Sequence, residues 1–265
     1  MKVLMEIRFN SFEHSLNTLE PSADFQKQID DVLNSWRNSF SYTLEEPENS
    51  IVGLRTPQIG AIHATLAHWA VSTETATIVM PTGTGKTETM LSVLIIKRCQ
   101  RLLVIVPTDV LRTQISGKFL GLGILKEISV ASKDALFPIV GILRHIPKTV
   151  DEVDNFFMKC QVIVTTMKIV AESEPNIQDH IATYCPYVFI DEAHHVAAPT
   201  WKKFTERFQK NSILQFTATP FRNDGKPILG KIIFNYPLRK AQKKVISNPL
   251  ISNLLLNLIL KKLIW

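Results

Sequence analysis

The stretch Met80-Pro81-Thr82-Gly83-Thr84-Gly85-Lys86-Thr87 decides the fold of this 265-residue chain. It follows a short β-prone run at residues 77–80 and precedes an apolar helical pattern over residues 90–95. A strand, a glycine-rich turn and a helix that opens with Gly-Lys-Thr form a phosphate-binding loop. The glycines let backbone N–H groups wrap phosphate oxygens, and the helix N-terminus adds a partial positive charge.

The loop predicts a site for ATP with Mg²⁺. Lys86 supplies a mobile charge for the outer phosphates, and Thr87 offers its hydroxyl to the metal. The strict motif has a glycine where this chain has Met80, which is the one departure from the pattern. The residues predicted to bind the nucleotide in this loop are Pro81, Thr82, Gly83, Thr84, Gly85, Lys86 and Thr87.

The cysteine spacing, the net charge and the length of the apolar runs exclude several classes of protein. The three cysteines have no C-x-x-C spacing, which excludes a disulfide framework and favours a reducing, cytoplasmic compartment. The net charge is +6, but residues 231–265 hold seven basic residues and no acid, so residues 1–230 carry −1. The basic balance therefore gives no argument for nucleic-acid binding by the body of the chain. The N-terminus lacks the apolar core of a signal peptide, and no apolar run is long enough to span a bilayer, so we expect no membrane partner.

Apolar runs with intervening helical patterns predict an α/β fold with a doubly wound, mainly parallel sheet. Ligands of such sheets gather at the carboxyl ends of the strands. The expected strands cover residues 77–80, 102–106 (closed by Pro107), 139–143, 161–166, 187–190 and 213–217. Thr108 is expected to cap a helix over 109–119.

Paired carboxylates follow the strand at 187–190. A Mg·ATP site needs a carboxylate for the metal and a group that positions water at the γ-phosphate. Asp191 can hold the metal together with Thr87, while Glu192 acts on the water. The small hydroxyl residues Thr217 and Thr219, which follow the next strand, can relay hydrogen bonds between His194 and bound substrate. Gln58, ahead of the loop, is a candidate for the adenine edge because a carboxamide both donates and accepts.

These motifs together resemble the first RecA-like motor domain of superfamily 2 helicases. Gln58 resembles the Q-motif glutamine, residues 81–87 motif I, Asp191-Glu192-Ala193-His194 motif II in its DEAH form, and residues 217–219 motif III. The continuation at residues 219–226 is most similar to the branch with type III restriction subunits. The resemblance implies that Lys86, Asp191, Glu192 and His194 are catalytic.

The resemblance also implies a nucleic-acid partner, with DNA favoured over RNA by the branch alone. The implied contacts lie in motifs Ia and Ib, where amides and hydroxyls bind phosphates without reading bases. They are Pro107, Thr108, Gln114, Thr165 and Thr166. The family further uses a second RecA-like motor domain, which supplies an arginine to the ATP site and would come in cis or in trans.

The chain is expected to divide into three parts. Residues 1–50 form a helical extension and linker, with apolar residues at helical spacing over 25–36, Ser22 as N-cap and 43–50 as the linker. Residues 51–242 form the motor domain, and residues 243–265 form a basic, apolar tail in which the resemblance has stopped. We expect a truncated or frameshifted motor, with a genuine terminal helix that buries Leu254, Leu258 and Leu260 against a partner as the alternative for the tail. A non-catalytic nucleotide-binding module and an RNA helicase fragment remain as alternatives.

Overall fold

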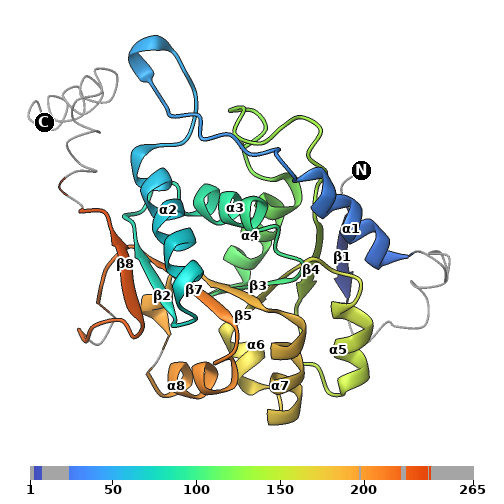
Figure 1. Cartoon of the computed structure of the whole chain (residues 1–265). Coiled ribbons are helices and arrows are strands. Elements are labelled where there is room, and N and C mark those ends of the chain that lie inside the picture. The colour runs from blue at the N-terminus through green and yellow to red at the C-terminus, as the bar shows by residue number, and fades with distance from the viewer. Residues whose placement is uncertain (1–2, 8–23, 197, 222–224, 238, 240–265) are drawn as a thin grey trace, which may run out of the picture.

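The computed structural model describes residues 3–7, 24–196, 198–221, 225–237 and 239. Its strands run parallel to one another in a single sheet (Figure 1). They are β1 (Val3–Ile7), β2 (Ala76–Val79), β3 (Leu102–Val106), β4 (Ile139–Leu143), β5 (Val162–Thr166), β6 (Tyr187–Ile190), β7 (Ser212–Thr217) and β8 (Lys231–Asn235).

The strand order is β1-β4-β5-β3-β6-β7-β2-β8, which confirms the predicted parallel α/β class. The phosphate-loop strand β2 lies between β7 and β8. Strand β6, which carries the paired carboxylates, lies between β3 and β7. Because every pair is parallel, the residues that follow each strand meet at one edge of the sheet.

Helices cover both faces of the sheet (Figure 1). Alternation along β3 explains why two faces need cover: Leu102, Val104 and Val106 pack on one side, and Leu103 and Ile105 on the other. The helices are α1 (Phe25–Ser35), α2 (Thr56–Val71), α3 (Lys86–Lys97), α4 (Asp109–Gly121), α5 (Val150–Phe157), α6 (Met167–Glu172), α7 (Pro175–Tyr184) and α8 (Ala198–Arg207), with the short 3₁₀ turns η1 (Pro47–Asn49) and η2 (Ala193–His195). None of these helices is long and apolar enough to cross a membrane in the part of the chain that is described.

The N-terminal region contributes both a strand and a helix to the fold. Strand β1 extends the sheet by pairing with β4, an element that the sequence prediction missed. Helix α1 packs on the main core as expected, and the indole of Trp36 at its end donates a hydrogen bond to the carbonyl of Leu136 (2.9 Å). The predicted N-cap is wrong, since Asp24 caps the helix by accepting from the N–H of Lys27 (3.0 Å), and Ser22 lies outside the described residues.

The expected linker forms a paired loop. Glu45 N–H bonds to Leu54 O (2.9 Å), and Glu46 and Ile51 exchange both of their backbone hydrogen bonds (3.0 Å each). This loop delivers the chain to the start of α2, beside the phosphate loop. Residues 243–265, the predicted tail, lie outside the described part of the chain.

Candidate nucleotide and nucleic-acid site

The phosphate loop joins β2 to α3 as predicted. Gly83 and Gly85 adopt left-handed φ values of +81° and +93°, which only glycine adopts without strain. The Thr84 hydroxyl donates to Pro81 O (2.6 Å) and closes the turn. Met80, the departure from the strict motif, is fully buried in the core at the end of β2. Its side chain thus points away from the loop's phosphate side, and the larger residue replaces glycine without blocking the loop.

The two glycines offer a matched pair of variants. In Gly83→Ala the new Cβ meets open space, so the cost is the left-handed backbone alone, about 1–2 kcal/mol. In Gly85→Ala the Cβ also overlaps the amide nitrogen of Gln58, which must move. Urea unfolding should therefore show a loss of stability for Gly85→Ala that exceeds that for Gly83→Ala by about 1–3 kcal/mol. Equal losses would contradict the packing of Gln58 on the loop.

Lys86 and Glu192 form an ion pair across the site. The Nζ of Lys86 lies 2.7 Å from Oε1 of Glu192, and the two side chains are 10% and 20% exposed. Glu192 has a left-handed φ of +47°, unusual for a residue with a side chain and typical of strained functional positions. Its second oxygen, Oε2, is buried and has no hydrogen-bond partner within the described protein. Such an orphaned carboxylate oxygen fits a site that water or a ligand completes.

Asp191 is the only buried carboxylate in the described core. Burial, followed by the charge of the adjacent Glu192, raises its pKa to about 6, although Lys86 and the Glu192 N–H oppose the rise. The N–H of Glu192 donates to Asp191 Oδ1 (3.0 Å), which fixes the carboxylate at the strand end. No cluster of three His, Cys, Asp or Glu ligands occurs among the described residues. One carboxylate with the Thr87 hydroxyl fits Mg²⁺, which keeps several of its waters.

His194 and Thr217 are in direct contact, as the sequence predicted. Thr217 Oγ1 donates to Thr219 O (2.8 Å), accepts from Thr219 N–H (3.2 Å) and lies 3.1 Å from Nδ1 of His194. Because the single hydroxyl proton goes to Thr219, Nδ1 of His194 must be the donor. Burial lowers the pKa of His194, with a further decrease from His195, which favours this neutral imidazole. Nδ1 also lies 3.4 Å from Glu192 Oε2 without a hydrogen bond to it, so side chains of motifs II and III meet around this nitrogen.

Gln58 lies at the start of α2 against the phosphate loop. Its Oε1 accepts from Arg55 N–H (2.6 Å), and its Nε2 donates to Gly85 O (3.2 Å). One N–H and one lone pair remain for a base edge, so adenine recognition stays a prediction. The sequence reasoning missed Arg55, whose Nη1 donates to Gly83 O (2.7 Å) while Nε faces Glu45 at 3.8 Å. A basic residue three positions before Gln58 was the available signal.

The predicted nucleic-acid residues differ in their access to solvent. Thr108 and Gln114 are exposed and Pro107 is partly exposed, and the Thr108 hydroxyl caps α4 by accepting from Leu111 N–H (3.3 Å). Thr166 ends β5 and is 6% exposed. Thr165 is fully buried, and its hydroxyl donates to Leu143 O (3.2 Å) inside the sheet. In this conformation the Thr165 side chain does not reach a ligand outside the protein.

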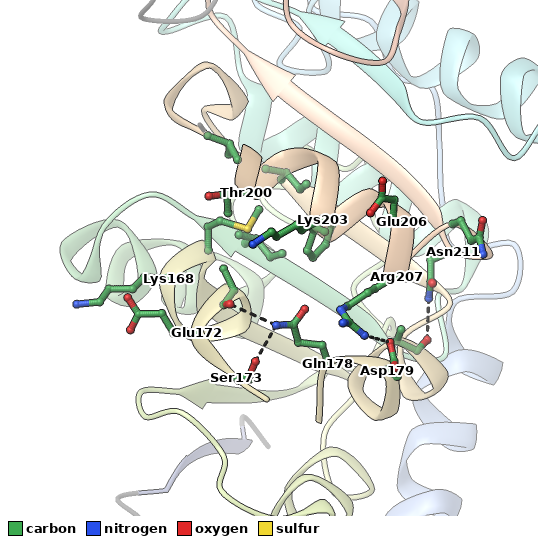
Figure 2. A pocket seen from close by; sticks show the side chains of 18 of the residues that line it. Lys168, Glu172, Ser173, Gln178, Asp179, Thr200, Lys203, Glu206, Arg207 and Asn211 are labelled. Atoms are coloured by element: carbon green, nitrogen blue, oxygen red, sulfur yellow. Dashed lines mark hydrogen bonds and ion pairs between the residues drawn. The ribbon is translucent and has the colours of Figure 1, made fainter. Parts of the chain in front are cut away.

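A groove of about 1,470 Å³ runs between α6 and α7 on one side and α8 on the other (Figure 2). Asp191 and Glu192 line one end of it, and none of the lining residues belongs to the phosphate loop. Arg207 of α8 pairs with Asp179 of α7 (2.8 Å) across the groove, and Gln178 donates to Ser173 O (2.7 Å). Side chains of both charge signs line the walls, so its electrostatics favour no one ligand.

The parallel sheet, phosphate loop and paired carboxylates define a P-loop NTPase. Residues 51–222 match the family model described as type III restriction enzyme, res subunit. This match covers more than half of the chain, and the chain therefore belongs to that family. It is a helicase-family, RecA-like motor domain, whose relatives in general use ATP with Mg²⁺.

Solved structures with a similar fold include the UvsW helicase from bacteriophage T4, at 16% identity and a TM-score of 0.47, over 76% of this chain and 62% of that chain. A nuclease-deletion mutant of the type ISP restriction-modification enzyme LlaGI, in complex with a DNA substrate mimic, matches at 16% identity and a TM-score of 0.49. This match covers 72% of this chain and 20% of that chain. The DUF1998 helicase MrfA bound to DNA matches at 16% identity and a TM-score of 0.45, over 68% of this chain and 25% of that chain. The chain thus spans less than two thirds of each of these proteins. A search of the curated proteins finds no match.

Proposed function

We propose that this chain is the ATP-binding half of a nucleic-acid-dependent ATPase, a DNA helicase or translocase of restriction, repair or defence type. The observation that carries the proposal is the meeting of Lys86, Glu192 and His194 at the strand ends beside a glycine loop. Two separate strands deliver these groups, β2 for Lys86 and β6 for Glu192 and His194, so their convergence is a property of the fold. Helix α3 aims its N-terminus at the same place.

The residues present divide the chemistry of phosphoryl transfer. The γ-phosphate competes with Glu192 for the ammonium of Lys86, so binding of the nucleotide frees the Glu192 carboxylate. Glu192 then orients a water for attack, while Asp191 and Thr87 hold the metal. Mg²⁺ held there would neutralise part of the phosphate charge. His194 relays the state of Glu192 to Thr217 and Thr219 through its Nδ1 proton.

The proposal includes a second RecA-like motor domain, in cis or in trans. An exposed Arg55 contacts the loop itself, but its guanidinium bonds to Gly83 O and does not project from a partner. We therefore assign the arginine that stabilises the transition state to the second domain. Nucleic acid would cross the edge marked by Thr108 and Thr166, with DNA preferred.

Two titrations on the purified chain test the proposal and separate its rivals. A fluorescent ATP analogue with Mg²⁺ reports nucleotide binding, and labelled single strands of DNA and RNA of one sequence report nucleic-acid binding by anisotropy. We expect binding of nucleotide, together with weak, salt-sensitive binding of DNA. Nucleotide binding with no affinity for either strand would support a non-catalytic module. Tighter binding of RNA than of DNA would support an RNA helicase fragment.

A further inference from the structure

A second, smaller cavity of about 550 Å³ lies at the carboxyl ends of β4 and β5. The loop between β4 and α5 forms one side, with Arg144 and Lys148, and α6 forms another, with Lys168. Thr166, at the end of β5, lies in its wall. The motifs described above do not include these three basic residues.

We infer that this cavity binds the phosphodiester backbone of a nucleic-acid strand, with Lys148 and Lys168 as its main phosphate contacts. The inference rests on the proposed function and extends it to residues outside the motifs. The cavity adjoins Thr166, and β5 is the neighbour of β3, whose end carries Thr108. Adjacent strands lie about 4.8 Å apart, so the cavity continues the edge marked by these two threonines.

The charges in the cavity favour an anion. Lys148 and Lys168 are exposed, and within the described chain neither ammonium group has a carboxylate at ion-pair distance. Two of the acids in the lining already have partners. Asp109 pairs with Arg112 (3.0 Å), and Glu152 accepts the backbone N–H of Lys148 (2.7 Å) at the start of α5. The charge of Asp109 is thus offset by a cation, while Glu152 is held at the N-terminus of α5, where the helix dipole favours a negative charge.

Glu172 is the carboxylate that opposes an anion here. It lies one turn after Lys168 on α6, lines the same cavity and is exposed. Figure 2 shows the two side chains close together on this helix. Its charge weakens the field of Lys168, so its removal should tighten the binding of a phosphate. Substitutions with opposite expected effects on phosphate binding are therefore available at one site.

The test is anisotropy of a fluorescein-labelled oligothymidylate across a salt series, with the whole chain. Each phosphate contact of a single strand contributes about 0.7 to the slope of log K against log salt. Lys148→Ala/Lys168→Ala should lower that slope by about 1.4 and weaken binding roughly 50-fold at about 50 mM salt. Glu172→Gln should strengthen binding at the same salt by about twofold to fivefold.

The matched control is Lys27→Ala/Lys202→Ala, which removes two exposed lysines from α1 and α8 with the same change in net charge. It should keep the wild-type slope to within about 0.3. Circular dichroism and Mg·ATP affinity should be unchanged in every variant, since none of these residues touches the nucleotide site. If the cavity variant matches the control in slope and affinity, the inference is wrong while the proposed function stands.

Two further outcomes would also overturn the inference about this cavity. The first comes from a competition experiment, in which inorganic phosphate at matched ionic strength should displace the oligonucleotide no better than chloride does. Displacement by phosphate would mean that the cavity takes the free anion instead of a strand. A wild-type chain that binds Mg·ATP but no oligonucleotide at any salt would remove both the inference and the proposed function.

Discussion

Purified residues 1–265 should hydrolyse Mg·ATP about 10³–10⁵-fold more slowly than the same domain joined to a second motor domain. The reason is the charge that develops on the γ-phosphate as its bond breaks. Lys86 and the proposed metal ligands Thr87 and Asp191 belong to this chain, but an arginine supplied from outside contributes that factor in such enzymes. A steady-state phosphate-release assay, with and without single-stranded DNA, measures the rate.

Addition of the second motor domain, fused or as a separate chain, should restore hydrolysis that DNA stimulates. Glu192→Gln in that assembly should then abolish turnover and leave nucleotide binding intact, because an amide cannot accept the proton of the attacking water. Glu206→Gln, on the exposed face of α8, is a matched control and should have no effect. Robust DNA-stimulated hydrolysis by residues 1–265 alone would contradict the assignment of the arginine to another domain.

Lys86→Ala should weaken Mg·ATP binding by roughly 10–100-fold or more, since a charged hydrogen bond to phosphate is lost. The same change leaves Glu192 partly buried without its cation, which should lower the free energy of unfolding by about 1–3 kcal/mol. A nucleotide titration and a urea unfolding curve measure the two effects on one preparation.

A double variant separates binding from folding. Lys86→Ala/Glu192→Gln removes the unpaired charge, so it should recover most of the lost stability while nucleotide binding stays weak. Lys97→Ala, in the last turn of the same helix α3, controls for loss of a lysine and should bind nucleotide normally. Wild-type affinity in Lys86→Ala would remove the phosphate loop from the proposed function.

The sequence alone determined the class of fold and the centre of the site. The continuous apolar runs at β3 and β5 are buried on both faces, and such runs occur almost only in parallel sheets. The phosphate loop and the acidic pair after β6 were found because their chemistry depends on adjacent residues. The contact of His194 with Thr217 is part of the predicted relay, whose link to substrate stays a prediction.

Tertiary structure alone decided the features that depend on distant neighbours. Strands β1 and β8 are the two edges of the sheet, β8 is largely exposed, and only pairing with β4 and β2 defines them. Thr165 is buried because β5 lies inside the sheet between β3 and β4 and is covered on both faces, and its hydroxyl donates to Leu143 O. Lys148 and Lys168 are 20 residues apart in sequence, and only the parallel register of β4 and β5 brings them to one cavity. Short sequence motifs determine the local chemistry of the site. The burial of a side chain, and the approach of charged residues that are distant in sequence, depend on which strands become neighbours.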